Sequence, residues 1–69
     1  MKLKLDRDAF KLMLLKRRVS EHSMCKEAGI TPQNFCRIKR VDANVRMSTA
    51  SKICSALSCD LVDIFFVLD

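Results

Sequence analysis

The sequence predicts a compact all-α domain of five short helices, with the alternative that its two ends form short strands. The chain has 69 residues, of which 49% are apolar, with a single Gly and a single Pro. That composition is typical of one small folded domain rather than of a disordered chain. Apolar residues recur at helical spacing, and capping residues stand between the segments. We therefore expect one domain over residues 1–69.

The first helix is expected from about Arg7 to Arg18. Asp6 is a suitable N-cap, and the cations at 16–18 favour a helix C-terminus through the helix dipole. Its inner stripe follows the spacing i, i+3, i+4, i+7 and consists of Phe10, Met13, Leu14 and Arg17. Residues 1–5 alternate Lys and Leu, which fits either a short strand or a loose arm.

The second helix is expected over about 21–28. Ser20 is its N-cap, and Gly29 stands where a left-handed residue ends a helix. The inward face consists of Met24, Cys25 and Ala28. Only residues 29–31 separate this helix from the next one.

The third helix is expected over about 32–40. Thr31 is the N-cap, and Pro32 is the first helical residue, where its missing N–H costs nothing. Ile30 and Phe35 have the spacing of a hydrophobic staple. Two capped helices joined by so short a turn are typical of a helix-turn-helix motif.

Residues 41–46 are polar enough to be a loop. A fourth helix is expected over about 48–58, with the inner residues Met47, Ala50, Ile53, Cys54 and Leu57. A fifth helix begins at the N-cap Asp60, and Cys59 and Ile64 could form a second staple. Its inner residues are expected to be Leu61, Ile64, Phe65 and Leu68. The alternative is that residues 65–68 form a strand.

Charge is distributed unevenly along the chain. Residues 1–52 hold all 13 Lys and Arg and five acids, a net charge of +8. Residues 53–69 hold three acids and no base, a net charge of −3. The basic body indicates a polyanionic partner.

The third helix has a polar, cationic face opposite Phe35 and Ile38. Four residues make up this face: Gln33, Cys36, Arg37 and Arg40. Arg can bind guanine, and Gln or Asn can bind adenine, through paired hydrogen bonds in the major groove. Taken alone, the cations would also fit an ordinary solvated helix face. Together with the tight turn they predict double-stranded DNA as the partner, with base-reading residues Pro32, Gln33, Asn34, Cys36 and Arg37.

Phosphate contacts are expected from cations further along this helix and from the free N–H groups of helix N-termini. The expected phosphate-contacting residues are Ser20, His22, Lys39, Arg40, Arg46 and Ser48.

Residues from about Leu12 to Phe65 resemble the Cro/repressor-type (Xre) helix-turn-helix family. The stretch Ser20–Thr31 is similar to the capped second helix and Gly turn of that family, and Ile53–Phe65 is similar to a subgroup with the pattern IC-x-AL-x-C-x-x-x-DI. The resemblance implies a five-helix domain without enzymatic activity. It implies that the domain binds operator DNA, usually as a homodimer, and regulates transcription, here as a repressor.

The chain departs from the family pattern in three places. Glu21 stands where the family often has Gln, and we expect it either to turn away from DNA or to pair with Lys26. Lys39 and Val41 stand where the family usually has a Glu-Gly pair. Leu14 stands where its usual Arg partner would be. Because both members of that charge pair are replaced together, no charge is stranded.

A protein-interaction module, such as an antirepressor or an antitoxin-like subunit, is the alternative function. Its surface would include the apolar ends, Leu3, Leu5, Phe66 and Val67, which otherwise complete the core or a homodimer interface. An enzyme is not expected, because the chain has one His, no nucleophile with a recognisable base and no glycine-rich phosphate loop.

The four cysteines, Cys25, Cys36, Cys54 and Cys59, have irregular spacing and lack paired CxxC clusters. We expect reduced thiols in a cytoplasmic protein, with no metal, cofactor or small-molecule substrate. No apolar stretch is long enough to span a membrane, and no secretory leader is evident. Cys36 should face outward between cations, which favour the reactive thiolate, so redox sensitivity is a hypothesis for this residue.

Overall fold

Five helices and two strands lie in residues 2–40 and 44–68, the parts of the chain that the computed structural model describes. In chain order they are β1 (Lys2–Leu5), α1 (Arg7–Arg17), α2 (Glu21–Ala28), α3 (Pro32–Ile38), α4 (Met47–Leu57), α5 (Leu61–Ile64) and β2 (Phe65–Leu68). The predicted five-helix architecture is confirmed. Residues 41–43 of the expected 41–46 loop, Val41 among them, lie outside the described residues.

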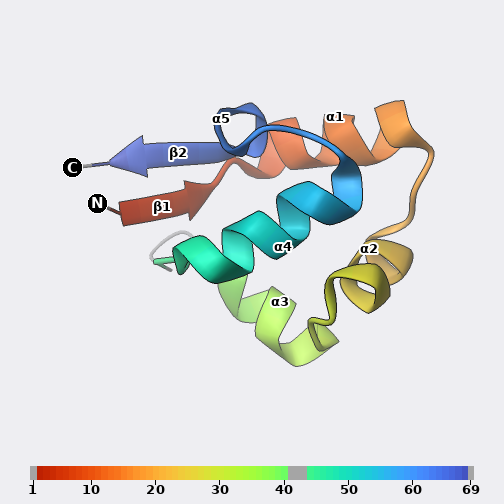
Figure 1. Ribbon diagram of the computed structural model, residues 1–69, viewed down its shortest axis with the longest axis horizontal. Helices are drawn as coiled ribbons and strands as arrows, with labels where there is room; N and C mark the ends of the chain where they lie inside the picture. The colour runs from red at the N-terminus through yellow and green to blue at the C-terminus, as the bar shows by residue number, and fades with distance from the viewer. Residues whose placement is uncertain (1, 41–43, 69) are drawn as a thin grey trace.

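The two chain ends pair with each other as one antiparallel sheet (Figure 1). Leu3 is opposite Val67 and Leu5 is opposite Phe65. Leu3 and Leu5 are buried and complete the core, whereas Val67 stays partly exposed. The expectation that Leu68 faces inward is wrong. Since side chains alternate along a strand, Leu68 points to the side away from Phe65 and is 46% exposed.

The core lies between α4 and the elements around it. Its largest fully buried side chains are Leu3, Met24, Phe35, Ile53, Leu57 and Ile64. The ring of Phe10 on α1 meets the ring of Phe35 on α3 at 5.2 Å between centroids, in a tilted arrangement. Met47, expected to face inward, is instead 43% exposed. It is the first residue of α4, and the buried stripe of that helix begins about one turn later at Ala50.

Three helices end in the same way, with a C-cap residue in the left-handed region. These residues are Arg18 after α1, Gly29 after α2 and Ser58 after α4. In each case the N–H of the following residue donates to the carbonyl five residues earlier: Val19 to Leu14, Ile30 to Cys25, and Cys59 to Cys54. These closures end each helix within one residue of its last turn.

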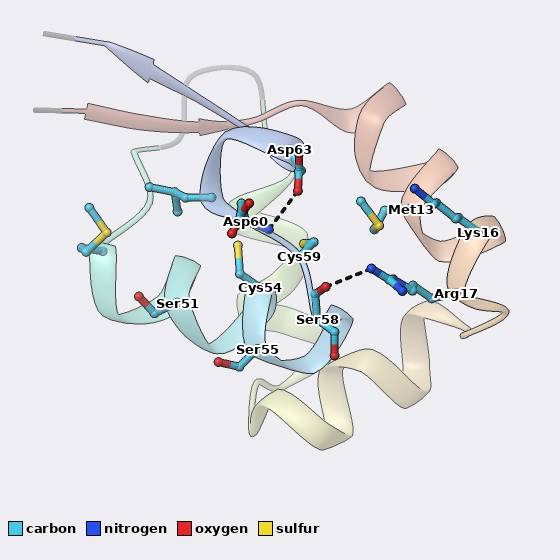
Figure 2. Close-up of a pocket in the computed structure, with 12 residues that line it drawn as sticks. Met13, Lys16, Arg17, Ser51, Cys54, Ser55, Ser58, Cys59, Asp60 and Asp63 are labelled. Atoms are coloured by element: carbon cyan, nitrogen blue, oxygen red, sulfur yellow. Dashed lines mark hydrogen bonds between the residues drawn. The ribbon is translucent and has the colours of Figure 1, made fainter.

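Side chains cap the N-termini that the sequence indicated. Asp6, Ser20 and Thr31 accept the backbone N–H of the residue three positions later, at 3.2, 3.1 and 3.3 Å. At α5 the backbone N–H of Asp60 donates to Oδ2 of Asp63 at 2.9 Å (Figure 2). Each of these bonds is local, so the start of each helix is fixed by a few neighbouring residues.

Candidate nucleic-acid interface

Helix α3 has one buried side and one exposed side. Phe35 is 1% exposed and fixes the helix against the core. The five predicted base-reading residues are all exposed: Pro32, Gln33, Asn34, Cys36 and Arg37. We call these five residues the α3 surface. In Figure 1, α3 and the terminal sheet lie on opposite sides of α4.

Helix α3 ends at Ile38, whereas the sequence led us to expect about Arg40. Lys39 is its C-cap, and the N–H of Arg40 donates to the carbonyl oxygen of Arg37 at 3.2 Å. Such an i to i+3 bond tightens the last turn and stops the α-helical pattern. Arg40 is therefore exposed just beyond the helix end.

A groove of about 540 Å³ lies between α3 and the start of α4. Its cations are Arg37, Arg46 and Lys52. The other polar lining residues are Asn34, Asn44 and Thr49, and no acidic side chain among the described residues lines the groove. The exposed side of α3 is thus joined to α4 by a groove whose charged side chains, among the described residues, are all positive.

Sequence reasoning missed Lys52, Thr49 and Asn44. Thr49 and Lys52 are three residues apart and share one face of α4, the face turned toward α3. That spacing was visible in the sequence. The orientation of this face toward α3 depends on the packing of α4 against the helices around it, which no local pattern reports.

The N-termini of α2 and α4 differ in their free hydrogen-bonding groups. At α4, Arg46 is the N-cap and makes no side-chain cap bond within the described residues, and Ser48 is exposed. At α2, the hydroxyl of Ser20 accepts from the N–H of Ser23 and donates to its Oγ at 3.0 Å. His22 is exposed and shares a small hollow with Pro32. In the described part of the chain, the N–H groups at the start of α4 therefore lack the side-chain cap that the start of α2 has.

Glu21 makes an ion pair that the sequence did not predict. Its Oε1 accepts from Nζ of Lys39 at 2.8 Å, and that Nζ lies 5.5 Å from the centre of the Phe35 ring. The expectation that Glu21 pairs with Lys26 is wrong. Five residues along a helix correspond to a rotation of about 140°, so Lys26 points away from the side of α2 that Glu21 occupies.

Cys25 and Cys54 are buried, Cys59 is partly exposed, and Cys36 is exposed. Burial raises the pKa of Cys25, and the nearby carboxylate of Glu21 acts in the same direction. Burial raises the pKa of Cys54 to about 12, with a further contribution from Cys59. The pKa of Cys59 is also raised, chiefly by burial. A raised pKa keeps these thiols protonated, and so weakly nucleophilic, over a wider range of pH than a free cysteine.

Cys54 and Cys59 line a second, open hollow of about 630 Å³ (Figure 2). It lies between α1, α4 and the start of α5, and none of its lining residues comes from α2 or α3. Within the described part of the chain, no group of three or more His, Cys, Asp or Glu is placed to hold a metal ion. The cationic groove beside α3 is the better candidate for a site that binds an anionic partner.

A family model for the Cro/C1-type HTH DNA-binding domain matches residues 10–67. The chain belongs to this family. The Cro/C1-type assignment confirms the resemblance drawn from the sequence and makes the chain a DNA-binding domain of a regulator type. No curated protein and no solved structure matches the chain. None of the helices in residues 2–40 and 44–68 is long and apolar enough to cross a membrane.

Proposed function

We propose that this Cro/C1-type domain binds double-stranded DNA in a sequence-specific manner, with α3 in the major groove, and acts as a transcriptional repressor. One observation carries the proposal: the exposed side of α3 continues into a groove that holds Arg37, Arg46 and Lys52. The cationic surface suits the phosphates of the DNA backbone, and the exposed polar side chains of the neighbouring helix suit the edges of the bases.

The α3 surface would read the bases. Arg37 would pair with guanine O6 and N7, and Gln33 or Asn34 with adenine N6 and N7, since all three side chains are exposed. Pro32 and Cys36 are small apolar surfaces that suit a thymine methyl group.

The phosphate backbone would lie on both sides of α3. Arg46, Lys52 and the free N–H groups at the start of α4, with Ser48, would hold one strand. Ser20, His22 and Arg40 would meet phosphates on the α2 side. Contacts of this kind fix the position of the protein on DNA and make binding depend on salt.

We further propose that the domain acts as a homodimer, joined through β2. On the far side of β1, the carbonyl of Leu3 accepts from the N–H of Val45 at 2.9 Å. At the start of β2 the N–H of Phe65 donates to the carbonyl of Leu61, so the part of this edge that we assign to a second copy is residues 66–68. Phe66, Val67 and Leu68 are exposed along this strand, which carries no charge. A second copy could pair antiparallel with β2 about a twofold axis, placing apolar residues opposite each other.

Fluorescence anisotropy on two labelled duplexes tests the DNA proposal. One duplex is the sequence upstream of the chain's own coding region, and the other is its scrambled version, each at 50 and 200 mM salt. We expect tighter binding to the upstream duplex and weaker binding at the higher salt. Equal, salt-sensitive binding to both would leave DNA binding in place with an operator elsewhere. No binding to either duplex at 50 mM salt would favour the protein-interaction module instead.

A further inference from the structure

An acidic side chain lies at the margin of the candidate DNA surface. Glu21 is the first residue of α2, and it lines a small hollow with Pro32, the first residue of α3. Its carboxylate also binds Lys39, the residue that follows the end of α3. Glu21 therefore lies close to both ends of the helix that we assign to the major groove.

Lys39 is restrained by two groups of its own chain. Its Nζ lies 2.8 Å from Oε1 of Glu21 and 5.5 Å from the centre of the Phe35 ring. A DNA phosphate that recruited this ammonium group would have to remove it from both. The two side chains of the pair keep 33% and 45% of their surface exposed, so the pair contributes little to folding stability. The pair matters more for DNA binding, because a phosphate must compete with Glu21 for the ammonium group of Lys39.

We propose that Glu21 is a built-in electrostatic brake on DNA binding. It occupies Lys39, and its carboxylate repels the phosphate backbone that approaches α3. This inference rests on the proposed function. Backbone affinity is independent of sequence, so the penalty applies to every duplex. A long-lived complex then forms only where base contacts from the α3 surface are added. In the native chain Lys39 holds Glu21 rather than a phosphate.

The substitution Glu21→Gln tests the brake, with Asp8→Asn as a matched control. Both substitutions remove one negative charge. Asp8 is an exposed residue in the first turn of α1, a helix that meets α3 through the buried ring of Phe10. The probe is a labelled duplex of random sequence, titrated by anisotropy between 50 and 200 mM salt. Thermal unfolding of each variant shows that it is folded.

We expect Glu21→Gln to bind the random duplex about five- to tenfold more tightly than wild type at low salt. Its plot of log affinity against log salt should steepen by about 0.9, the value for one added phosphate contact. Asp8→Asn should stay within about twofold of wild type. If Glu21→Gln binds no more tightly than Asp8→Asn, the brake does not exist.

The double variant Glu21→Gln with Lys39→Gln tests whether Lys39 carries the gain. We expect it to return to about the affinity and salt slope of wild type. A double variant as tight as the single one would overturn the assigned role of Lys39. Failure of wild type to bind any duplex at low salt would remove the proposed function and the brake together. Wild-type binding that Glu21→Gln leaves unchanged would remove the brake alone.

Discussion

Nη2 of Arg17 donates to the carbonyl oxygen of Ser58 at 3.0 Å and so joins the last turn of α1 to the C-cap of α4, 41 residues further along the chain (Figure 2). Ser58 adopts a left-handed conformation, which is part of the sharp turn into α5. The periodicity of α1 placed Arg17 at the end of its inner stripe. The side chain is exposed, and its charged head binds the edge of the neighbouring helix instead of entering the core.

The Arg17 bond predicts a stability difference between two adjacent cations. Arg17→Ala should lower the free energy of unfolding by about 1 kcal/mol, because it removes a hydrogen bond made by a charged donor at a partly solvated site. Lys16→Ala is the control, since Lys16 lies in the same last turn and makes the same contribution to the helix dipole. Urea unfolding measures both. Equal losses in the two variants would show that the bond to Ser58 does not stabilise the fold.

The three left-handed C-caps predict opposite effects for glycine and alanine substitutions. Arg18 and Ser58 have φ of 54° and 51°, a strained region for side chains with a Cβ, so Arg18→Gly and Ser58→Gly should each raise the free energy of unfolding by about 0.5–1 kcal/mol. Gly29→Ala should lower it by about 1 kcal/mol. A Cβ at Gly29 would meet no described atom within 4 Å, so this loss is purely conformational. Urea unfolding that ranks the variants in another order would contradict this account.

The buried thiol of Cys54 predicts that stability declines at alkaline pH. Its pKa is about 12 in the folded chain against an ordinary value of 9.0, mainly because burial disfavours the thiolate. Between these two values the unfolded state binds fewer protons than the folded state, so the free energy of unfolding falls as pH rises. Below about pH 9 this contribution is fully present.

Urea unfolding at pH 7, 8.5 and 10 measures this decline. The decline should be smaller in Cys54→Ala, although Cys25 and Cys59 keep part of it because burial also raises their pKa values. Cys36→Ala is the matched control, because it removes an exposed thiol and leaves Cys54 in place. An identical pH profile for Cys54→Ala and wild type would show that Cys54 is not the group responsible.

Local interactions explain what the sequence could predict. The caps at Ser20 and Thr31 and the turn at Gly29 depend on bonds that span three to five residues. The positions of these caps and of this turn therefore followed from residue type and spacing alone. The same is true of the buried position of Phe35 and the exposed α3 surface, which are fixed by helical periodicity.

Non-local pairing explains what the sequence left open. The two ends were ambiguous because their strands exist only through each other, as in the pairing of Lys2 with Leu68. The partner of Glu21 was missed because Lys39 comes from another helix. The cationic groove was missed because Lys52 and Arg37 line one groove only in the folded arrangement of α3 and α4.

The proposed dimer predicts that charge on β2 separates the two copies. Phe66 is 52% exposed, so Phe66→Lys should leave the core intact and place like charges near the twofold axis. Leu12→Lys is the control, because Leu12 is an exposed apolar residue of α1 and not of the sheet. Light scattering after gel filtration should give a dimer mass for wild type and Leu12→Lys and a monomer mass for Phe66→Lys. A monomeric wild type, or a dimer that only Leu12→Lys disrupts, would contradict an interface at β2.

The two arginines of the α3 region predict different kinds of loss on DNA. Arg37 belongs to the α3 surface, so Arg37→Ala should weaken binding to the upstream duplex by roughly 1–3 kcal/mol and reduce the preference over a scrambled duplex. Arg40 lies just beyond the helix end, where a phosphate is the expected partner, so Arg40→Ala should weaken binding to both duplexes about equally. Anisotropy titrations of each variant on both duplexes separate these effects. If Arg37→Ala keeps the wild-type preference while Arg40→Ala loses it, base reading occurs further along the chain than the α3 surface. If both variants bind as wild type does, α3 is not the element that contacts DNA.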